Sequence, residues 1–120
     1  MSTVAAILTG LIAILHLYIL WFEMFHWTTR GPRVFDSFPR ELFEPTRVMA
    51  ANQGLYNGFL AAGLLWSLFI QDPDWQKNVA ICFLLFVLVA GLYGWRTVST
   101  KILYVQVIPA VLALGAVIFG

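Results

Sequence analysis

Four long stretches of this chain contain no charged residue, and this feature constrains the fold more than any other. Residues 4–22, 48–70, 78–95 and 102–120 comprise 19, 23, 18 and 19 residues without Asp, Glu, Lys or Arg. A helix that crosses the hydrocarbon core of a membrane, roughly 30 Å thick, needs about 20 predominantly apolar residues. The sequence therefore predicts an all-α integral membrane four-helix bundle with four transmembrane helices.

The composition agrees with a membrane protein. Hydrophobic residues make up 61% of the chain and charged residues 11%, whereas about 25% of residues are charged in soluble domains. The 120 residues leave room for one domain, which we place at residues 1–120. The net charge of +1, without a basic stripe, argues against a nucleic-acid partner. The one cysteine, Cys82, allows no disulfide within the chain.

Local signals place the predicted spans at about residues 4–30, 46–70, 73–95 and 101–119. Gly31 followed by Pro32 is typical of a helix C-terminus, so the first span is expected to end near residue 30. Asp72 before Pro73 is typical of an N-cap followed by the first helical residue. Pro109 lies inside the fourth span, where it removes a backbone hydrogen bond and predicts a kink.

The distribution of lysine and arginine predicts the orientation in the membrane. Six of the seven basic residues lie in or beside the first and third loops, and the second loop carries only Lys77. Basic residues are enriched in cytoplasmic loops. We therefore expect a multi-pass protein of the cell inner (plasma) membrane with both termini outside and loops one and three in the cytoplasm.

The first loop, about residues 31–45, mixes charged residues with phenylalanines. Such a mixture suits a segment that lies on the lipid headgroups. It equally suits a connector whose phenylalanines pack on the end of the bundle. The sequence leaves both interpretations open.

Polar side chains inside the predicted spans gather in the cytoplasmic half of the membrane. At about 1.5 Å per residue, Glu23 lies about 6 Å and His16 about 16 Å from the inner interface. His16 and Glu23 are seven residues apart and share a helix face, as do Gln53 and Asn57. We call the full set of candidate ligand-binding residues the polar seam: His16, Glu23, His26, Asn52, Gln53, Tyr56, Asn57, Tyr93 and Gln106.

The polar seam has a structural and a functional interpretation. Asn and Gln inside a membrane often only hold helices together, at about 0.6 kcal/mol per contact. A carboxylate is costly there, although Glu23 could reach the interface or pair with Arg30 or Arg96. We favour a binding site, because side chains that only hold helices together have no reason to gather in one half. Glu23 and His16 are then the candidate proton-active pair, and both binding and acid–base chemistry remain open.

We predict no metal and no cofactor. Glu23 and His26 have the Glu-x-x-His spacing of carboxylate-bridged metal sites. Those sites need the motif twice together with further carboxylates, which the spans lack. The chain also offers no glycine-rich phosphate loop and no serine or cysteine nucleophile with a paired base.

Small residues form a ridge along the second span. Ala50, Gly54, Gly58 and Ala62 follow one another at intervals of four residues. Such a ridge allows another helix to approach closely. The preferred partner is a neighbouring span, with Gln53 and Asn57 turned toward Glu23 and His16. The alternative partner is a second copy of the chain, in a homodimer through Gly54 and Gly58.

Four stretches of the sequence resemble a known family. They are HLYILWFEMFHW at residues 16–27, NQGLYNGFLAAGL at 52–64, AGLYG at 90–94 and QVIPA at 106–110. The chain is similar, over essentially its whole length, to a bacterial family of small four-span integral membrane proteins catalogued as a domain of unknown function. The resemblance implies a multi-pass inner-membrane protein of about this length. It implies no substrate, reaction or catalytic residue.

Three functions are compatible with these features. The favoured one is a membrane protein with a polar pocket, in the cytoplasmic half of the bundle, for a small lipophilic ligand or substrate. The second is a structural or accessory subunit whose polar seam only holds helices together. The third is a proton-coupled exporter of lipophilic cations, since small multidrug exporters have four spans and a glutamate in the first helix. Against the third, Glu23 lies near one end of its span and the first loop is long.

Overall fold

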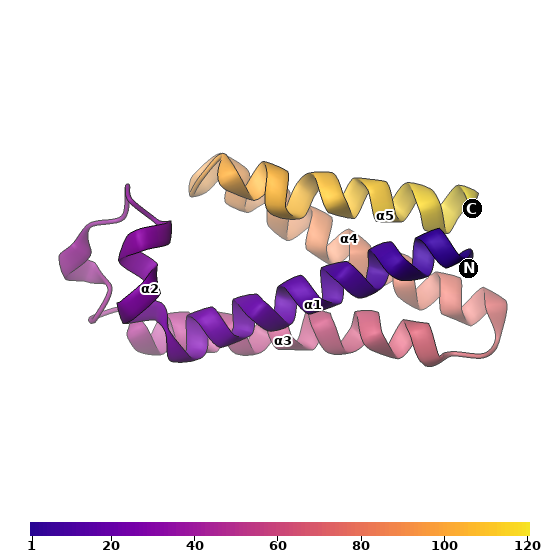
Figure 1. Cartoon of the computed structure of the whole chain (residues 1–120), viewed down its shortest axis with the longest axis horizontal. Helices are drawn as coiled ribbons and strands as arrows, with labels where there is room; N and C mark the ends of the chain where they lie inside the picture. Colours follow the sequence, from indigo (N-terminus) through magenta and orange to yellow (C-terminus); the bar gives the residue numbers. More distant parts are fainter. The chain divides into compact units, whose positions relative to one another are not determined.

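The computed structural model describes residues 1–120, and all of its regular elements are helical. The five α-helices are α1 (Thr3–Phe25), α2 (Trp27–Val34), α3 (Arg47–Phe69), α4 (Pro73–Thr97) and α5 (Ile108–Phe119) (Figure 1). A short 3-10 helix, η1 (Arg40–Leu42), precedes α3, and a π-helical turn, η2 (Leu103–Val107), leads into α5. The prediction of an all-α protein is confirmed.

Two of these helices are long and apolar enough to cross a membrane, as judged by length and composition. They are α1 and α4, with 23 and 25 residues. The continuous segment Leu103–Phe119, which joins η2 and α5, is a shorter apolar helix. The structure thus supports two spans, and the four-span organisation remains a prediction.

The chain folds into two compact units. The first unit comprises Met1–Ile14 and Leu60–Gly120, and the second comprises Leu15–Phe59. The boundary falls inside α1 and inside α3, so each of these helices contributes residues to both units. The assignment of residues 1–120 to one domain stays a prediction.

The first unit contains the apolar core. Its fully buried side chains come from α1, α3, α4 and α5, and they include Ala5, Ala13, Leu64, Ala80, Leu84, Val87, Ala110 and Ala113. Many of them are alanines, which allow helix backbones to approach closely. Gly63 extends this packing, since a Cβ at this position would overlap the ring of Phe83.

The predicted N-cap of α4 is confirmed. The Asp72 carboxylate accepts hydrogen bonds from the backbone N–H groups of Asp74 and Trp75, both at 3.0 Å. Pro73 is the first helical residue, where its missing N–H leaves no hydrogen bond unmade. The local signal in the sequence was sufficient to predict this N-cap, because a cap involves only neighbouring residues.

The prediction that the first helix runs to residue 30 and ends at Gly31 and Pro32 is wrong. α1 ends at Phe25, and His26 leaves the helical conformation with φ −131° and ψ 19°. α2 then carries Gly31 and Pro32 inside it, and no glycine in the chain has a positive φ. A Cβ at Gly31 would overlap the ring of Phe43. Gly31 therefore serves the close approach of an aromatic ring and not the end of a helix.

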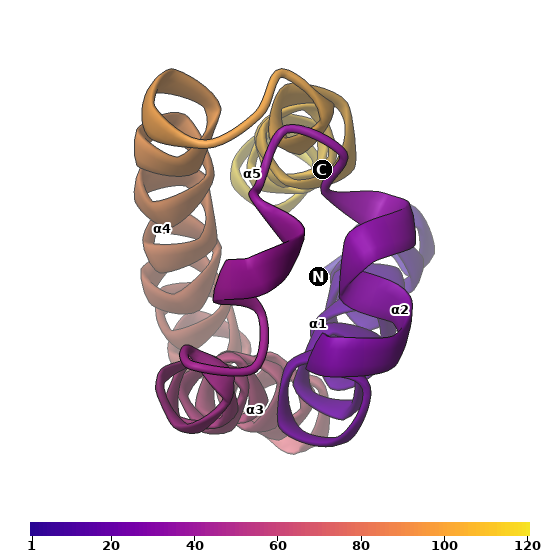
Figure 2. The ribbon, with the colours of Figure 1, turned by 90° about the vertical axis from the view of Figure 1, so that its left-hand side faces the viewer.

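Aromatic side chains pack together in a cluster within the second unit. The rings of Phe22, Phe35, Phe38 and Phe43 lie between 5.0 and 6.1 Å from the Trp27 ring, centroid to centroid. Figure 2 shows α2 and the segment that follows it in the foreground. Phe43 is only 2% exposed. The phenylalanines of the first loop thus pack into a folded connector, as one of the two interpretations of the loop expected.

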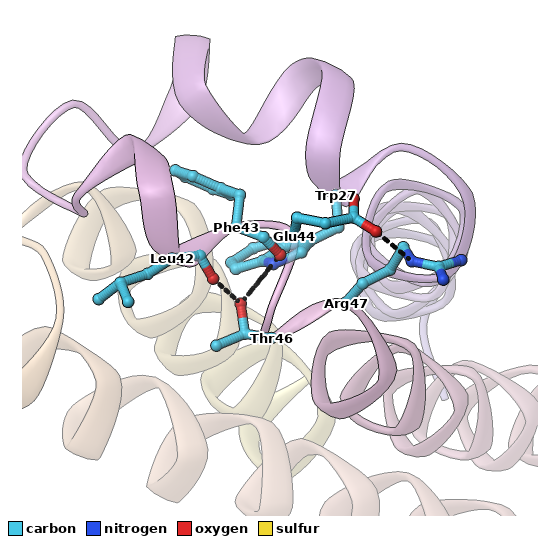
Figure 3. A network of polar contacts seen from close by, with 6 residues as sticks. All are labelled: Trp27, Leu42, Phe43, Glu44, Thr46 and Arg47. Atoms are coloured by element: carbon cyan, nitrogen blue, oxygen red, sulfur yellow. Dashed lines mark hydrogen bonds and ion pairs between the residues drawn. The ribbon is translucent and has the colours of Figure 1, made fainter.

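A small polar network anchors the start of α3 to this cluster (Figure 3). Trp27 Nε1 donates a hydrogen bond to Thr46 Oγ1 at 2.9 Å. The Thr46 hydroxyl in turn donates to the carbonyl oxygen of Leu42 at 2.7 Å. Arg47 and Glu44 form an exposed ion pair at 3.3 Å beside it. The indole, which is otherwise surrounded by apolar rings, has its one donor satisfied.

A π-helical turn precedes Pro109, whereas the predicted kink stays a prediction. Proline has no N–H for the carbonyl of Val105, and its ring crowds the preceding turn. In η2 the Ile108 N–H bonds to the Leu103 carbonyl, five residues back, which widens the turn. α5 begins directly afterwards, with Pro109 in its first turn.

Candidate functional site

A hydrogen bond between Glu23 of α1 and Asn57 of α3 is the centre of the candidate site. Asn57 Nδ2 donates to Glu23 Oε1 at 2.7 Å, across 34 positions of sequence. The same nitrogen donates to the backbone carbonyl of Gln53 at 3.0 Å. The two protons of the amide are thus both engaged, which holds the Asn57 side chain against Glu23. Both side chains are half-buried within the second unit.

Two glycines of α3 make this contact geometrically feasible. A Cβ at Gly54 would lie 2.8 Å from Met24 Cγ, 3.0 Å from Glu23 Cβ and 3.1 Å from the carbonyl oxygen of Leu20. A Cβ at Gly58 would overlap the side chain of Leu20. The expected packing of the small-residue ridge against a neighbouring helix is therefore confirmed at these two positions. The homodimer through Gly54 and Gly58 stays a prediction, on a face that α1 of the same chain occupies.

His16 is the one fully buried ionisable side chain. It lies on α1, seven residues before Glu23, which corresponds to two turns and about 10 Å along the axis. This spacing places the two residues on one stripe of the helix. The predicted pair therefore shares a helix face, with two turns of helix between its members.

The other predicted residues of α3 point elsewhere. Gln53 and Tyr56 are exposed, and Tyr56 packs edge-on against Phe59 with ring centroids 5.9 Å apart. Asn52 is also exposed, and its Nδ2 donates to the Val48 carbonyl of its own helix at 2.9 Å. Among these amide side chains of α3, only that of Asn57 bonds to Glu23. Gln53 accepts a hydrogen bond from Asn57 at its backbone carbonyl.

His26 lies beside aromatic and hydroxyl groups. Its ring is 4.0 Å from the Trp21 ring, centroid to centroid, and its Nδ1 is 3.3 Å from Thr29 Oγ1. The His26 N–H still donates to the Phe22 carbonyl at 3.0 Å, but the φ of −131° at His26 departs from the helical value and changes the direction of its side chain. The Glu-x-x-His spacing in the sequence is thus not a helical motif in the structure.

Tyr93 and Gln106 belong to the first unit. Tyr93 is 72% exposed near the end of α4. Gln106 lies in η2, and a Cβ at Gly91 would be 3.1 Å from Gln106 Cβ, so that η2 and α4 are in close contact. The convergence of all four predicted spans on one site remains a prediction.

Sequence reasoning missed a second group of side chains, around Arg30. The guanidinium carbon of Arg30 lies 5.5 Å from the Trp21 ring centroid and 6.0 Å from that of Tyr18. Arg30 therefore does not pair with Glu23, which was one alternative. The spacing of Tyr18 and Trp21 on one helix face was visible in the sequence. The break at His26, which brings Arg30 to them, was not.

The fold and the site define a small all-α protein with two potential membrane-crossing helices and a carboxylate–amide contact between α1 and α3. The chain belongs to the family described as protein of unknown function (DUF1304), whose model matches residues 10–118. It is 31% identical over 116 residues to the uncharacterized protein YpaA of Lactococcus lactis subsp. lactis (strain IL1403), covering 95% of this chain and 96% of that protein. No solved structure matches the chain. The family resemblance noted in the sequence is confirmed.

Proposed function

We propose that this protein crosses the cell inner membrane four times and binds a small lipophilic ligand at Glu23 and Asn57. α1 and α4 supply two spans, and α3 and Leu103–Phe119 would supply the others. α3 has 23 residues, so it is about 34 Å long at 1.5 Å per residue. Its first turn contains Arg47, and the rest is free of charge. The basic residues of loops one and three favour a cytoplasmic location for both loops.

The observation that carries this proposal is the incomplete hydrogen bonding of Glu23. A carboxylate can accept about four hydrogen bonds. Asn57 supplies one of them at 2.7 Å, and no basic side chain forms an ion pair with Glu23. A carboxylate inside a membrane span is costly unless it is paired or hydrogen-bonded. A ligand with a hydroxyl or amino group would supply the further donors and offset that cost.

The chemistry of the surroundings defines the rest of the ligand. Beside Glu23 and Asn57, Leu20 and Met24 of α1 lie against Gly54 and Gly58 of α3. We therefore expect the ligand to have an apolar body, which would pack in this environment, and a single polar group, which would bind the carboxylate. The ligand class is a small amphiphile.

His16 offers a second proton-active group deeper along the same helix stripe. Direct proton transfer needs heavy atoms about 2.6–3.2 Å apart, and two helical turns separate His16 from Glu23. A ligand that lies along α1 could contact both groups. Acid–base chemistry on such a ligand would then use Glu23 nearest the interface and His16 nearest the membrane centre.

A structural or accessory role is the second candidate, and the packing of Gly54 and Gly58 favours it. Close glycine contacts and an amide between helices are what hold membrane helices together. In that case the Glu23–Asn57 bond serves stability alone. The two functions differ in what happens to the fold when the bond is removed.

The test compares wild-type protein with Glu23→Gln and Asn57→Leu, each purified in mild detergent. Organic extracts of the three are analysed by mass spectrometry, and helix content is measured by circular dichroism. We expect a small amphiphile that co-purifies with the wild type and is depleted in both variants, while the helix content is kept. Glu44→Gln, which removes an exposed carboxylate, is the matched control and should retain the molecule. Equal loss of the fold in both variants would favour the structural role instead.

A further inference from the structure

Arg30 lies against two aromatic rings at the junction of α1 and α2. Its guanidinium carbon is 5.5 Å from the centroid of Trp21 and 6.0 Å from that of Tyr18. These are the distances at which a cation is attracted by the face of an aromatic ring. The two rings are themselves in contact, with centroids 5.7 Å apart. The three side chains form one exposed group, which we call the Arg30 cluster.

The break at His26 builds the Arg30 cluster. In an uninterrupted helix Arg30 would lie about 13 Å beyond Trp21 and about 18 Å beyond Tyr18 along the axis. The change of direction at His26 brings α2 back toward these rings. The His26 ring, 4.0 Å from Trp21, and its contact with Thr29 at 3.3 Å support that turn. The position of Arg30 is therefore set by the fold of the chain.

The guanidinium of Arg30 retains its capacity to bind an anion. Arg30 is exposed and forms no ion pair, unlike Arg47, which is paired with Glu44. The attraction to the two rings does not use the N–H donors of the guanidinium as hydrogen bonds to an acceptor atom. Those donors match the oxygen atoms of a phosphate group. Arg33, three residues further on α2, adds a second exposed positive charge nearby.

We propose that the Arg30 cluster binds the phosphate headgroup of an anionic phospholipid. Trp21 and Tyr18 lie four and seven residues before the end of α1, and tryptophan and tyrosine near the ends of spanning helices are typical of the membrane–water interface. On the same part of α1, Leu17 and Phe25 are exposed apolar side chains, which suit contact with acyl chains. The cytoplasmic leaflet, to which the proposed topology assigns this end of α1, carries the anionic lipids. The inference rests on the proposed membrane topology, but it does not depend on a ligand at Glu23.

The test measures lipid binding by native mass spectrometry of the full-length protein in mild detergent. The probes are phosphatidylglycerol, which is anionic, and phosphatidylcholine, which is neutral. We expect Arg30→Gln to weaken binding of the first phosphatidylglycerol about tenfold, as the loss of a charge-assisted hydrogen bond would. Arg40→Gln removes the same charge from an exposed position without an aromatic contact, and it should weaken binding less than about twofold. Phosphatidylcholine should bind weakly and equally to all variants.

Each of the following adverse outcomes would overturn the proposal. Equal weakening by Arg30→Gln and Arg40→Gln would indicate diffuse attraction to the whole loop. Displacement of the lipid by millimolar inorganic phosphate would indicate a site for a soluble phosphate. Loss of phosphatidylglycerol binding in Glu23→Gln would show that the lipid site is not separate from Glu23. Retained phosphatidylglycerol binding in Glu23→Gln supports a separate lipid site, even if that variant loses the ligand proposed at Glu23. If Arg30→Gln does not fold, Arg30→Lys takes its place, and unchanged lipid binding in that variant would count against a role of the guanidinium group.

Discussion

Replacement of Gly54 by alanine is expected to weaken the contact between α1 and α3. The new Cβ would lie 2.8 Å from Met24 Cγ and 3.1 Å from the carbonyl oxygen of Leu20. Met24 can change rotamer, but the carbonyl of Leu20 belongs to the helix backbone and cannot move away alone. The two helices must therefore separate, and this separation also lengthens the hydrogen bond between Glu23 and Asn57.

Two opposing terms set the magnitude of this effect. Alanine is favoured over glycine in a helix interior by about 1 kcal/mol. Overpacking of a tight contact costs about 1–3 kcal/mol. Gly54→Ala should therefore be about 0–2 kcal/mol less stable than the wild type. The net value is small because the helix preference hides part of the steric cost.

A matched control removes the helix preference from the comparison. Gly115 lies in α5, and a Cβ there would have no atom within 4 Å. Gly115→Ala should therefore show the gain in helix preference alone, so Gly54→Ala should be about 1–3 kcal/mol less stable than this control. The free energy of unfolding is measured in mixed micelles with rising dodecyl sulfate, followed by circular dichroism. If the two variants are equally stable, the close approach of α1 and α3 at Gly54 is refuted.

Three further perturbations test individual interactions by the same assay. A double-mutant cycle with Glu23→Gln and Asn57→Leu should give a coupling energy of roughly 0.5–2 kcal/mol, and strictly additive losses would show that their hydrogen bond contributes nothing. Trp27→Phe keeps the aromatic packing but removes the donor to Thr46, so a loss of about 0.5–1.5 kcal/mol is expected; an unchanged free energy of unfolding would contradict the role of this bond. Asp72→Ala should cost about 0.5–2 kcal/mol through loss of the α4 N-cap, whereas Asp72→Asn should restore most of it. Equal destabilisation by both Asp72 substitutions would argue against the cap.

The helical class and the N-terminus of α4 could be predicted because both depend on short-range rules. A long apolar run without charges can satisfy its backbone hydrogen bonds only as a helix if it lies in a membrane. The cap at Asp72 involves the N–H groups of Asp74 and Trp75, two and three residues later. Such signals are complete within a few neighbouring positions.

The end of α1 could not be predicted because it depends on residues far along the chain. Gly31 followed by Pro32 carries the usual signal of a helix end, and the helix breaks five residues earlier, at His26. The glycine is required because the ring of Phe43, twelve residues later, packs against it. A local pattern cannot distinguish a glycine that ends a helix from one that accommodates a distant ring.

Only part of the candidate site could be predicted from the sequence, because contacts between helices depend on residues far apart in the chain. The shared face of His16 and Glu23 follows from seven-residue spacing on one helix. The sequence placed Gln53 and Asn57 equally well for contact with Glu23, and only Asn57 makes it. The Arg30 cluster was not predicted, since it requires the turn at His26.

The order of residues by itself determined which stretches are helical, where their charges lie and which side chains share a helix face. These properties follow from backbone hydrogen bonding and from the fixed rotation of about 100° per residue. The tertiary structure decided which face of α3 meets α1, because helices approach most closely where glycines leave room. Gly54 and Gly58 provide that room, and their position brings Asn57 to the carboxylate of Glu23.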